Sequence, residues 1–137
     1  MSILKALQVR LEAAGITTNV ELGRVPAKPD AVIALLERPA NRSRDLNATN
    51  LPALETLRVQ VVARAGKDAG IGAAEAIAHA AYRALVGRHL SIVVGTDDPQ
   101  VLDWVIAEHV PAHTGYDAND RPLVSTTLSI QRHGTLS

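Results

Sequence analysis

Leu57-Arg58-Val59-Gln60-Val61-Val62-Ala63-Arg64 is the stretch on which the fold of this chain depends, because apolar side chains alternate along it. One face would carry the apolar residues Leu57, Val59, Val61 and Ala63, and the other would carry Arg58, Gln60, Val62 and Arg64. A period of two is typical of a β-strand with one buried face. We therefore predict a strand here, with Arg58, Gln60 and Arg64 on its exposed face.

A long helix is predicted directly after this strand. The three glycines within Gly66–Gly72 end the strand, and from Ile71 to Val86 the period changes. Small and apolar residues recur there at three- and four-residue steps, at Ile71, Ala74, Ile77, Ala78, Ala81 and Leu85. Such spacing forms one helical face, and its alanines would let the helix lie close against the sheet. Gly87 is expected to end the helix as its C′ residue.

The remaining apolar segments predict one more helix and several strands. A helix is expected over Ser2–Ala14, ended by Gly15. Strands are expected at Ile16–Leu22, Ala31–Arg38 and Leu90–Val94. The segment Arg38–Glu55 has no pattern, and unpatterned loops of that length in compact domains are usually functional or mobile.

The C-terminal third predicts a β-hairpin. Val101–Val110 fits either a helix capped by Asp98 or a strand rich in Val and Ile. Leu123–Gln131 alternates like a strand, and Tyr116–Pro122 before it is a dense turn signal. A polar turn between two strand-like segments favours the strand at Val101–Val110, so that the two segments pair as a hairpin.

Together these elements predict the fold class. Helices do not alternate one-for-one with strands, which argues against a fully parallel sheet. We expect an α+β fold with a mixed, largely antiparallel sheet, two main helices packed on one face and a C-terminal β-hairpin. The length of 137 residues suits a single domain over residues 1–137.

Composition argues against several classes of function. Lys and Arg total 14, as do Asp and Glu, so the chain is not a polybasic nucleic-acid binder. Aromatic residues make up 2% of the chain, too few for a base-stacking platform. There is no cysteine, and we find neither a signal peptide nor a segment that could cross a membrane. We therefore expect a soluble protein, made in the cytoplasm, that does not engage a membrane.

No chemical site emerges from the motifs. Gly66–Gly72 lies between a strand and a helix, as a phosphate-binding loop does, but no Lys-Ser or Lys-Thr pair follows it. Glu75 stands where a dinucleotide loop has its third glycine, and its charge would repel a pyrophosphate. His109 and His113 would lie about 13 Å apart in a strand, too far to share one metal ion. We expect no catalytic residue, cofactor or metal, and a nucleotide site at Gly66–Gly72 is a remote alternative.

The C-terminal turn and strand, taken together, carry a family resemblance. Gly115-Tyr116-Asp117-Ala118-Asn119-Asp120-Arg121, followed by Val124–Gln131, resembles the closing pattern of minor capsid and tail-completion proteins of long-tailed phages, including the tail terminator group. The likeness extends to the N-terminal helix, the central strand and the helix end Tyr82-Arg83-Ala84-Leu85. Many relatives have Gly where Asp120 stands, which leaves the turn type open.

This resemblance implies a structural virion protein at the tail–neck junction and not an enzyme. Such proteins form a homohexameric ring that caps the tail tube, ends its polymerisation and offers a surface to the neck or head-completion protein. Genome DNA would pass through the lumen without specific binding. A head–tail connector or stopper is the alternative, and it differs only in the side to which the protein binds.

Three polar segments are expected to contact a neighbouring subunit or a partner protein. They are the hairpin tip with Tyr116, Asp117, Asn119, Asp120 and Arg121, the loop with Arg38, Arg42 and Arg44, and the strand face with Arg58, Gln60 and Arg64. For the strand face the alternative is that it lines the ring. On this basis we expect Arg121→Glu to weaken assembly without unfolding the monomer.

Overall fold

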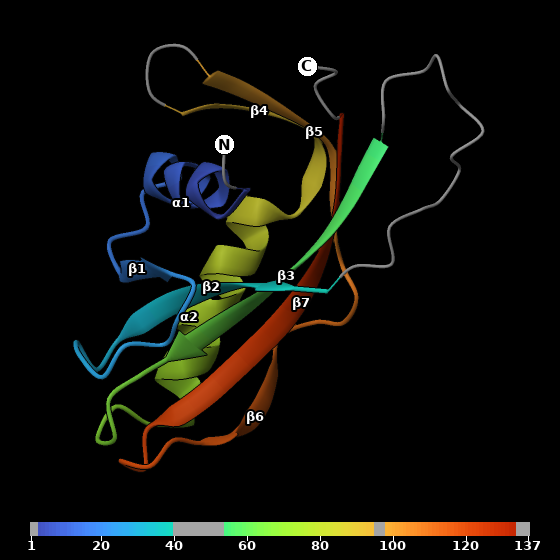
Figure 1. The fold of residues 1–137 in the computed structure, drawn as a ribbon. Helices are drawn as coiled ribbons and strands as arrows, with labels where there is room; N and C mark the ends of the chain where they lie inside the picture. Colours follow the sequence, from blue (N-terminus) through green and yellow to red (C-terminus); the bar gives the residue numbers. More distant parts are fainter. Residues whose placement is uncertain (1–2, 40–53, 95–97, 134–137) are drawn as a thin grey trace.

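The computed structural model describes residues 3–39, 54–94 and 98–133 (Figure 1). In these residues two helices and seven strands follow one another along the chain. In order they are α1 (Ile3–Ala13), β1 (Asn19–Leu22), β2 (Val32–Arg38), β3 (Leu54–Arg64), α2 (Gly70–Leu85), β4 (Gly87–Val94), β5 (Asp98–Ala107), β6 (Ala112–Tyr116) and β7 (Pro122–His133).

All seven strands belong to one mixed sheet. The strand order is β1-β2-β3-β7-β5-β4, and β6 pairs with β7 beside β5. Only the β1–β2 pair is parallel among the described pairs, and the others are antiparallel. β3 and β7 form the long central pair, whose register runs from Leu54 opposite His133 to Arg64 opposite Leu123. The α+β fold class and the largely antiparallel sheet are confirmed.

Both helices pack on the same face of this sheet. α2 lies across β3 and β7, while α1 lies between α2 and β4 (Figure 1). The alanine face of α2 is buried as predicted, and Ala74 and Ala81 are fully covered. Leu7 and Leu11 of α1 complete the same core. Burial of such side chains supplies the main driving force for folding, about 25 cal/mol per Å² of apolar surface.

The two helices end in different ways. Gly15 has a left-handed backbone with φ of 85° and closes α1, as predicted. Its N–H donates to Glu12 O and the N–H of Ile16 donates to Leu11 O, the pair of bonds of a Schellman motif. At the end of α2, Val86 is already extended, with φ −77° and ψ 132°, and the chain enters β4 directly. Gly87 thus follows the C-cap, as predicted, but it begins a strand and does not have the left-handed backbone that is common at C′.

The C-terminal hairpin differs from the prediction in its first strand. Val101–Ala107 is part of strand β5, which resolves the helix–strand ambiguity. However, β5 pairs with the far part of β7, from Leu128 to Arg132. The strand that the tight turn joins to β7 is β6, which pairs with Pro122–Ser125. β5 and β6 thus follow one another along the same edge of β7.

The long loop predicted over Arg38–Glu55 falls mostly on residues 40–53, outside the described residues, as do Arg42 and Arg44. Its ends are the C-terminal end of β2 and the N-terminal end of β3, which pair with each other through Arg38 and Arg58.

Candidate assembly surface

The face of the sheet opposite the helices carries a row of side chains that crosses four strands. Arg38 in β2 pairs with Arg58 in β3, which pairs with Ser129 in β7, which pairs with Ile106 in β5. Cross-strand partners lie on the same face of a sheet. Ile106 is 52% exposed, and Trp104, on the same side of β5, is 39% exposed. We call Arg38, Arg58, Trp104, Ile106 and Glu108 the open-face patch.

Arg58 and Glu108 form a two-pronged ion pair in this patch. Arg58 Nε lies 2.8 Å from Glu108 Oε2, and Arg58 Nη2 lies 3.1 Å from Oε1. The hydrogen bond from this guanidinium to Glu108 raises the pKa of Arg58. Both side chains stay well exposed, so the pair orients the two residues more than it stabilises the fold. Next to it, Arg38 Nε donates to Gln60 Oε1 over 2.9 Å.

The ion pair borders a shallow open cleft of about 450 Å³. Pro39, Thr56, Arg58, Glu108 and Ser129 line it. The cleft is thus lined by charged, hydroxyl and proline groups, and the exposed side chains of Trp104 and Ile106 belong to the same sheet face. Such a mixture of Arg and Trp with polar neighbours is typical of protein–protein contact surfaces. Trp104 and Ile106 were not among the predicted contact residues, although alternation in β5 places both on the face opposite buried Val105.

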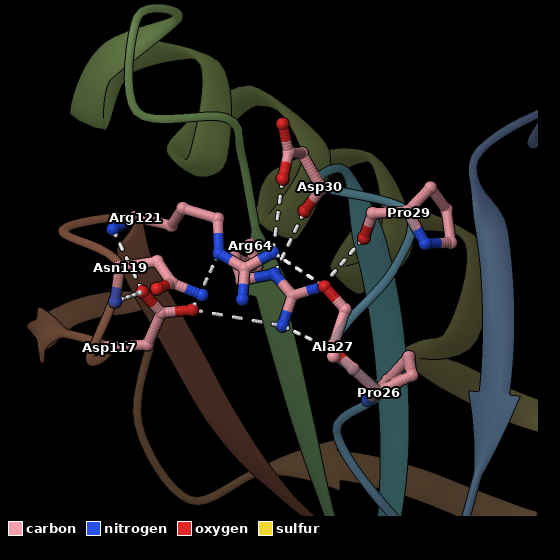
Figure 2. A network of polar contacts seen from close by, with 8 residues as sticks. All are labelled: Pro26, Ala27, Pro29, Asp30, Arg64, Asp117, Asn119 and Arg121. Atoms are coloured by element: carbon pink, nitrogen blue, oxygen red, sulfur yellow. Dashed lines mark hydrogen bonds and ion pairs between the residues drawn. The ribbon is translucent and has the colours of Figure 1, made fainter.

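A buried arginine, Arg64, lies on the same sheet face at the C-terminal end of β3. Arg64 is 2% exposed, so the prediction that it lies on an exposed face is wrong. Its guanidinium donates to three backbone carbonyls of the β1–β2 loop, at Pro26 (2.6 Å), Pro29 (2.6 Å) and Asp30 (2.8 Å) (Figure 2). Burial lowers the pKa of Arg64, assisted by the nearby positive charge of Arg121. Asp117 is its acidic neighbour, with an Nη1–Oδ2 distance of 3.8 Å.

Arg121 bridges the same loop and the hairpin turn. Its Nε donates to Asp117 Oδ2 over 2.7 Å, and its Nη1 donates to Ala27 O and to Asp30 Oδ1 (Figure 2). Only 6% of Arg121 is exposed. Desolvation disfavours its charge, but the bonds to Asp30 and Asp117 outweigh this effect and raise the pKa of Arg121. The expectation that Arg121→Glu leaves the monomer folded is therefore withdrawn, because the side chain is an internal anchor.

Asp117 builds the turn itself. Its Oδ1 accepts the backbone N–H groups of Asn119 and Arg121, each over 2.9 Å. Asp120 has a left-handed backbone with φ of 57°. Glycine adopts that conformation at lower cost than aspartate, so the turn keeps Asp120 in a conformation that is unusual for a residue with a side chain. Tyr116 remains 56% exposed at the start of the turn, with its ring edge-on to His113 at a centroid distance of 5.0 Å.

Comparison with known proteins then gives the family. A sequence model described as "Bacteriophage tail terminator protein" matches residues 10–133. This chain belongs to the bacteriophage tail terminator family. Among solved structures it is similar to a chain of one described as "Virion of native gene transfer agent (GTA) particle", with 19% sequence identity, a TM-score of 0.61 and coverage of 97% of this chain and 96% of that one. At that identity the likeness shows a shared fold. No curated protein matches the chain in sequence.

Membership of the tail terminator family makes this protein a structural component of a phage tail and of the virion. The match confirms the resemblance seen in the C-terminal turn and strand. The matched segment also includes the open-face patch and the buried residues Arg64, Asp117 and Arg121. The contacts of these residues with other subunits stay predictions.

The described residues of this tail terminator family member also bear on a metal site, a membrane-spanning helix and the glycine-rich loop. Among the described residues, no group of three or more His, Cys, Asp or Glu side chains could hold a metal ion. Neither α1 nor α2 is long and apolar enough to span a membrane. Gly66–Gly72 contains a short turn at residues 67–69 and the first residues of α2, where Gly70 has a left-handed backbone.

Proposed function

We propose that this protein forms a homohexameric ring on the head-proximal end of the phage tail tube, where it ends tube polymerisation and joins the tail to the neck or head-completion protein. The family match over residues 10–133 carries this proposal. The protein acts by shape and surface and not as an enzyme, and genome DNA crosses the lumen without specific binding. Equal numbers of acidic and basic residues suit a lumen that lets DNA slide.

The open-face patch supports a role in contacts between subunits. A ring needs a heterologous interface, in which one surface of a subunit meets a different surface of the next. Trp and Arg are the residues that most often dominate such contacts, and both stand on the patch. Arg38 and Arg58 are accordingly proposed to meet the neighbouring subunit together with Trp104 and Ile106.

The hairpin tip is the second proposed contact. Tyr116, Asn119 and Asp120 are exposed there, while Asp117 and Arg121 hold the tip from inside. Arg42 and Arg44, which lie outside the described residues, remain proposed contacts in the loop between β2 and β3.

A tube-length assay tests the proposal. The tail tube protein is polymerised alone and with increasing amounts of this protein, and tube lengths are measured by electron microscopy. We expect shorter tubes that carry one added ring at one end. Tubes of unchanged length without added density at either end would contradict tube capping. An added density on a head portal in place of the tube would favour the connector or stopper function.

The contact residues are tested in the same assay. Trp104→Glu combined with Ile106→Glu should abolish tube shortening, because two charges would enter the proposed interface. Glu75→Lys is the matched control, since Glu75 is exposed on α2, on the other side of the sheet. Full capping activity in the double variant would exclude the open-face patch as a contact.

A further inference from the structure

Two segments far apart in the sequence are held together by two buried guanidinium groups. One is the β1–β2 loop from Pro26 to Asp30, and the other is the β6–β7 turn around Asp117 (Figure 2). Arg64 and Arg121 take up four backbone carbonyls and one carboxylate oxygen of the loop. Arg121 also binds the turn through Asp117. We call these two arginines and the segments that they bind the arginine clamp.

Filling this space with a charged side chain has a free-energy cost. Taking the charge of Arg64 out of water is unfavourable, and most of its partners are neutral carbonyls. An apolar side chain of similar volume would pack in this position without that cost. What the guanidinium adds is a flat fork of N–H donors that fixes several acceptors in one plane. Arg64 therefore sets the shape of the loop.

The surface that results is exposed and has a fixed geometry. Residues 27–30 of the loop are exposed, as are Tyr116 and residues 118–120 of the turn. Val25, beside the anchored Pro26, exposes 41% of its surface, and Tyr116, beside the anchored Asp117, exposes 56%. Two outer segments, each with an exposed apolar residue, are thus locked to one another by contacts beneath them.

We propose that Arg64 is a positioning residue for ring closure, because it holds the loop and the turn as one rigid surface onto which a second copy of this chain docks. This inference rests on the proposed ring. A ring closes only if every copy is rotated by the same angle relative to the next. If the contact were made by two loops that move independently, the rotation angle between neighbouring copies would vary. The clamp removes this freedom before the subunits meet, which lowers the ordering cost of docking.

Arg64→Met tests the proposal, because methionine keeps the apolar bulk and removes every donor. Hydrogen exchange should become faster both in residues 27–30 and in residues 119–121, since the two segments are coupled. The protein concentration needed for half-assembly, followed by light scattering, should rise about tenfold or more. Arg24→Met is the matched control: Arg24 precedes the same loop but its side chain is 75% exposed, so exchange and assembly should match the wild type.

Chemical rescue separates positioning from general stability. In Arg64→Ala the carbonyls of Pro26, Pro29 and Asp30 would surround a gap shaped for a guanidinium ion. Millimolar guanidinium should restore slow exchange in both segments and assembly, whereas urea, which has the same shape but no charge, should restore neither. This test also covers the case in which Arg64→Met does not fold, because refolding of Arg64→Ala can be followed with each additive.

Three results would overturn the inference. An Arg64→Met variant that melts at a lower temperature yet assembles at the wild-type concentration would make Arg64 purely structural. Faster exchange confined to residues 27–30 would show that the two segments are not coupled. Equal rescue by urea and guanidinium would exclude a specific carbonyl site. A wild-type protein that forms no ring would instead refute the proposed function, and with it the docking role of the clamp.

Discussion

Arg64 Nη1 lies 3.8 Å from Asp117 Oδ2, which joins the end of the central strand β3 to the turn between β6 and β7. The same carboxylate oxygen accepts a 2.7 Å hydrogen bond from Arg121 Nε. One carboxylate thus faces two buried guanidinium groups while its other oxygen holds the turn. We therefore expect stability, acid sensitivity and the geometry of the outer surface to depend on this carboxylate.

Acid should destabilise the protein through Asp117. Burial opposes its charge, but bonds from the Arg121 and Asn119 backbone and from the Arg121 side chain prevail and lower the pKa of Asp117. Because the folded-state pKa lies below that of the unfolded chain, the stabilisation is present above about pH 4 and is lost as the pH falls through the lowered value. Thermal unfolding from neutral pH downward should show this loss. The Asp117→Asn variant should melt at a lower temperature than the wild type at neutral pH, and its melting temperature should depend less on pH below about pH 4. A melting temperature that falls with pH in parallel with that of the wild type would contradict this role of Asp117.

Arg121→Glu should unfold or strongly destabilise the monomer. The change places a third carboxylate beside Asp117 and Asp30 and leaves the Ala27 carbonyl without its donor. Circular dichroism melting is the measurement, and Arg121→Lys should fall between the variant and the wild type. A variant that melts like the wild type but assembles poorly would instead support a direct contact role for Arg121 at the hairpin tip.

Trp104 should report assembly by its own fluorescence. It is the only tryptophan of the chain and is partly exposed on the open-face patch. If this patch meets the next subunit, the emission maximum should move to shorter wavelength as the concentration passes the assembly point. Assembly without any spectral shift would place the interface elsewhere. Ile106→Glu should suppress both the shift and the rise in mass, since it adds a charge beside Trp104.

Ala81→Leu should destabilise the fold by about 1–3 kcal/mol, because a larger side chain is forced between α2 and the sheet. Ala81 is fully buried, whereas Ala76 is exposed on the same helix. Ala76→Leu is therefore the matched control, expected to change the free energy of unfolding by less than about 0.5 kcal/mol. Urea unfolding gives both values. Equal effects at the two positions would contradict the close helix–sheet packing described above.

The sequence predicted well where one physical rule decides the local structure. The residues of β3 alternate with the period of a strand, and the alanines of α2 recur with the period of a helix. Each pattern has one buried side, so it predicted the correct element. Gly15 was also predicted, because a left-handed residue at a helix end is a local requirement. Gly87 does follow the end of α2, but the chain passes there into β4 without the left-handed step that usually goes with a glycine at this position.

The candidate site was harder to predict because its residues are brought together by tertiary structure. Arg64 and Arg121 have the charge of surface residues, but the fold buries them between the Pro26–Asp30 loop and the β6–β7 turn. No local pattern in the sequence points from a strand arginine to carbonyls of a distant loop. Trp104 and Ile106 could have been placed on the open face by alternation with Val105, but whether helices cover that face depends on how the whole sheet is packed.

The mass of the protein in solution, measured by light scattering alone and with tail tube protein, tests the central claim most directly. We predict a particle of six copies of the 14.5 kDa chain, formed either by the protein alone or on the end of the tube. A protein that stays monomeric at all concentrations, and that neither binds the tube protein nor stops its polymerisation, would contradict the proposed ring.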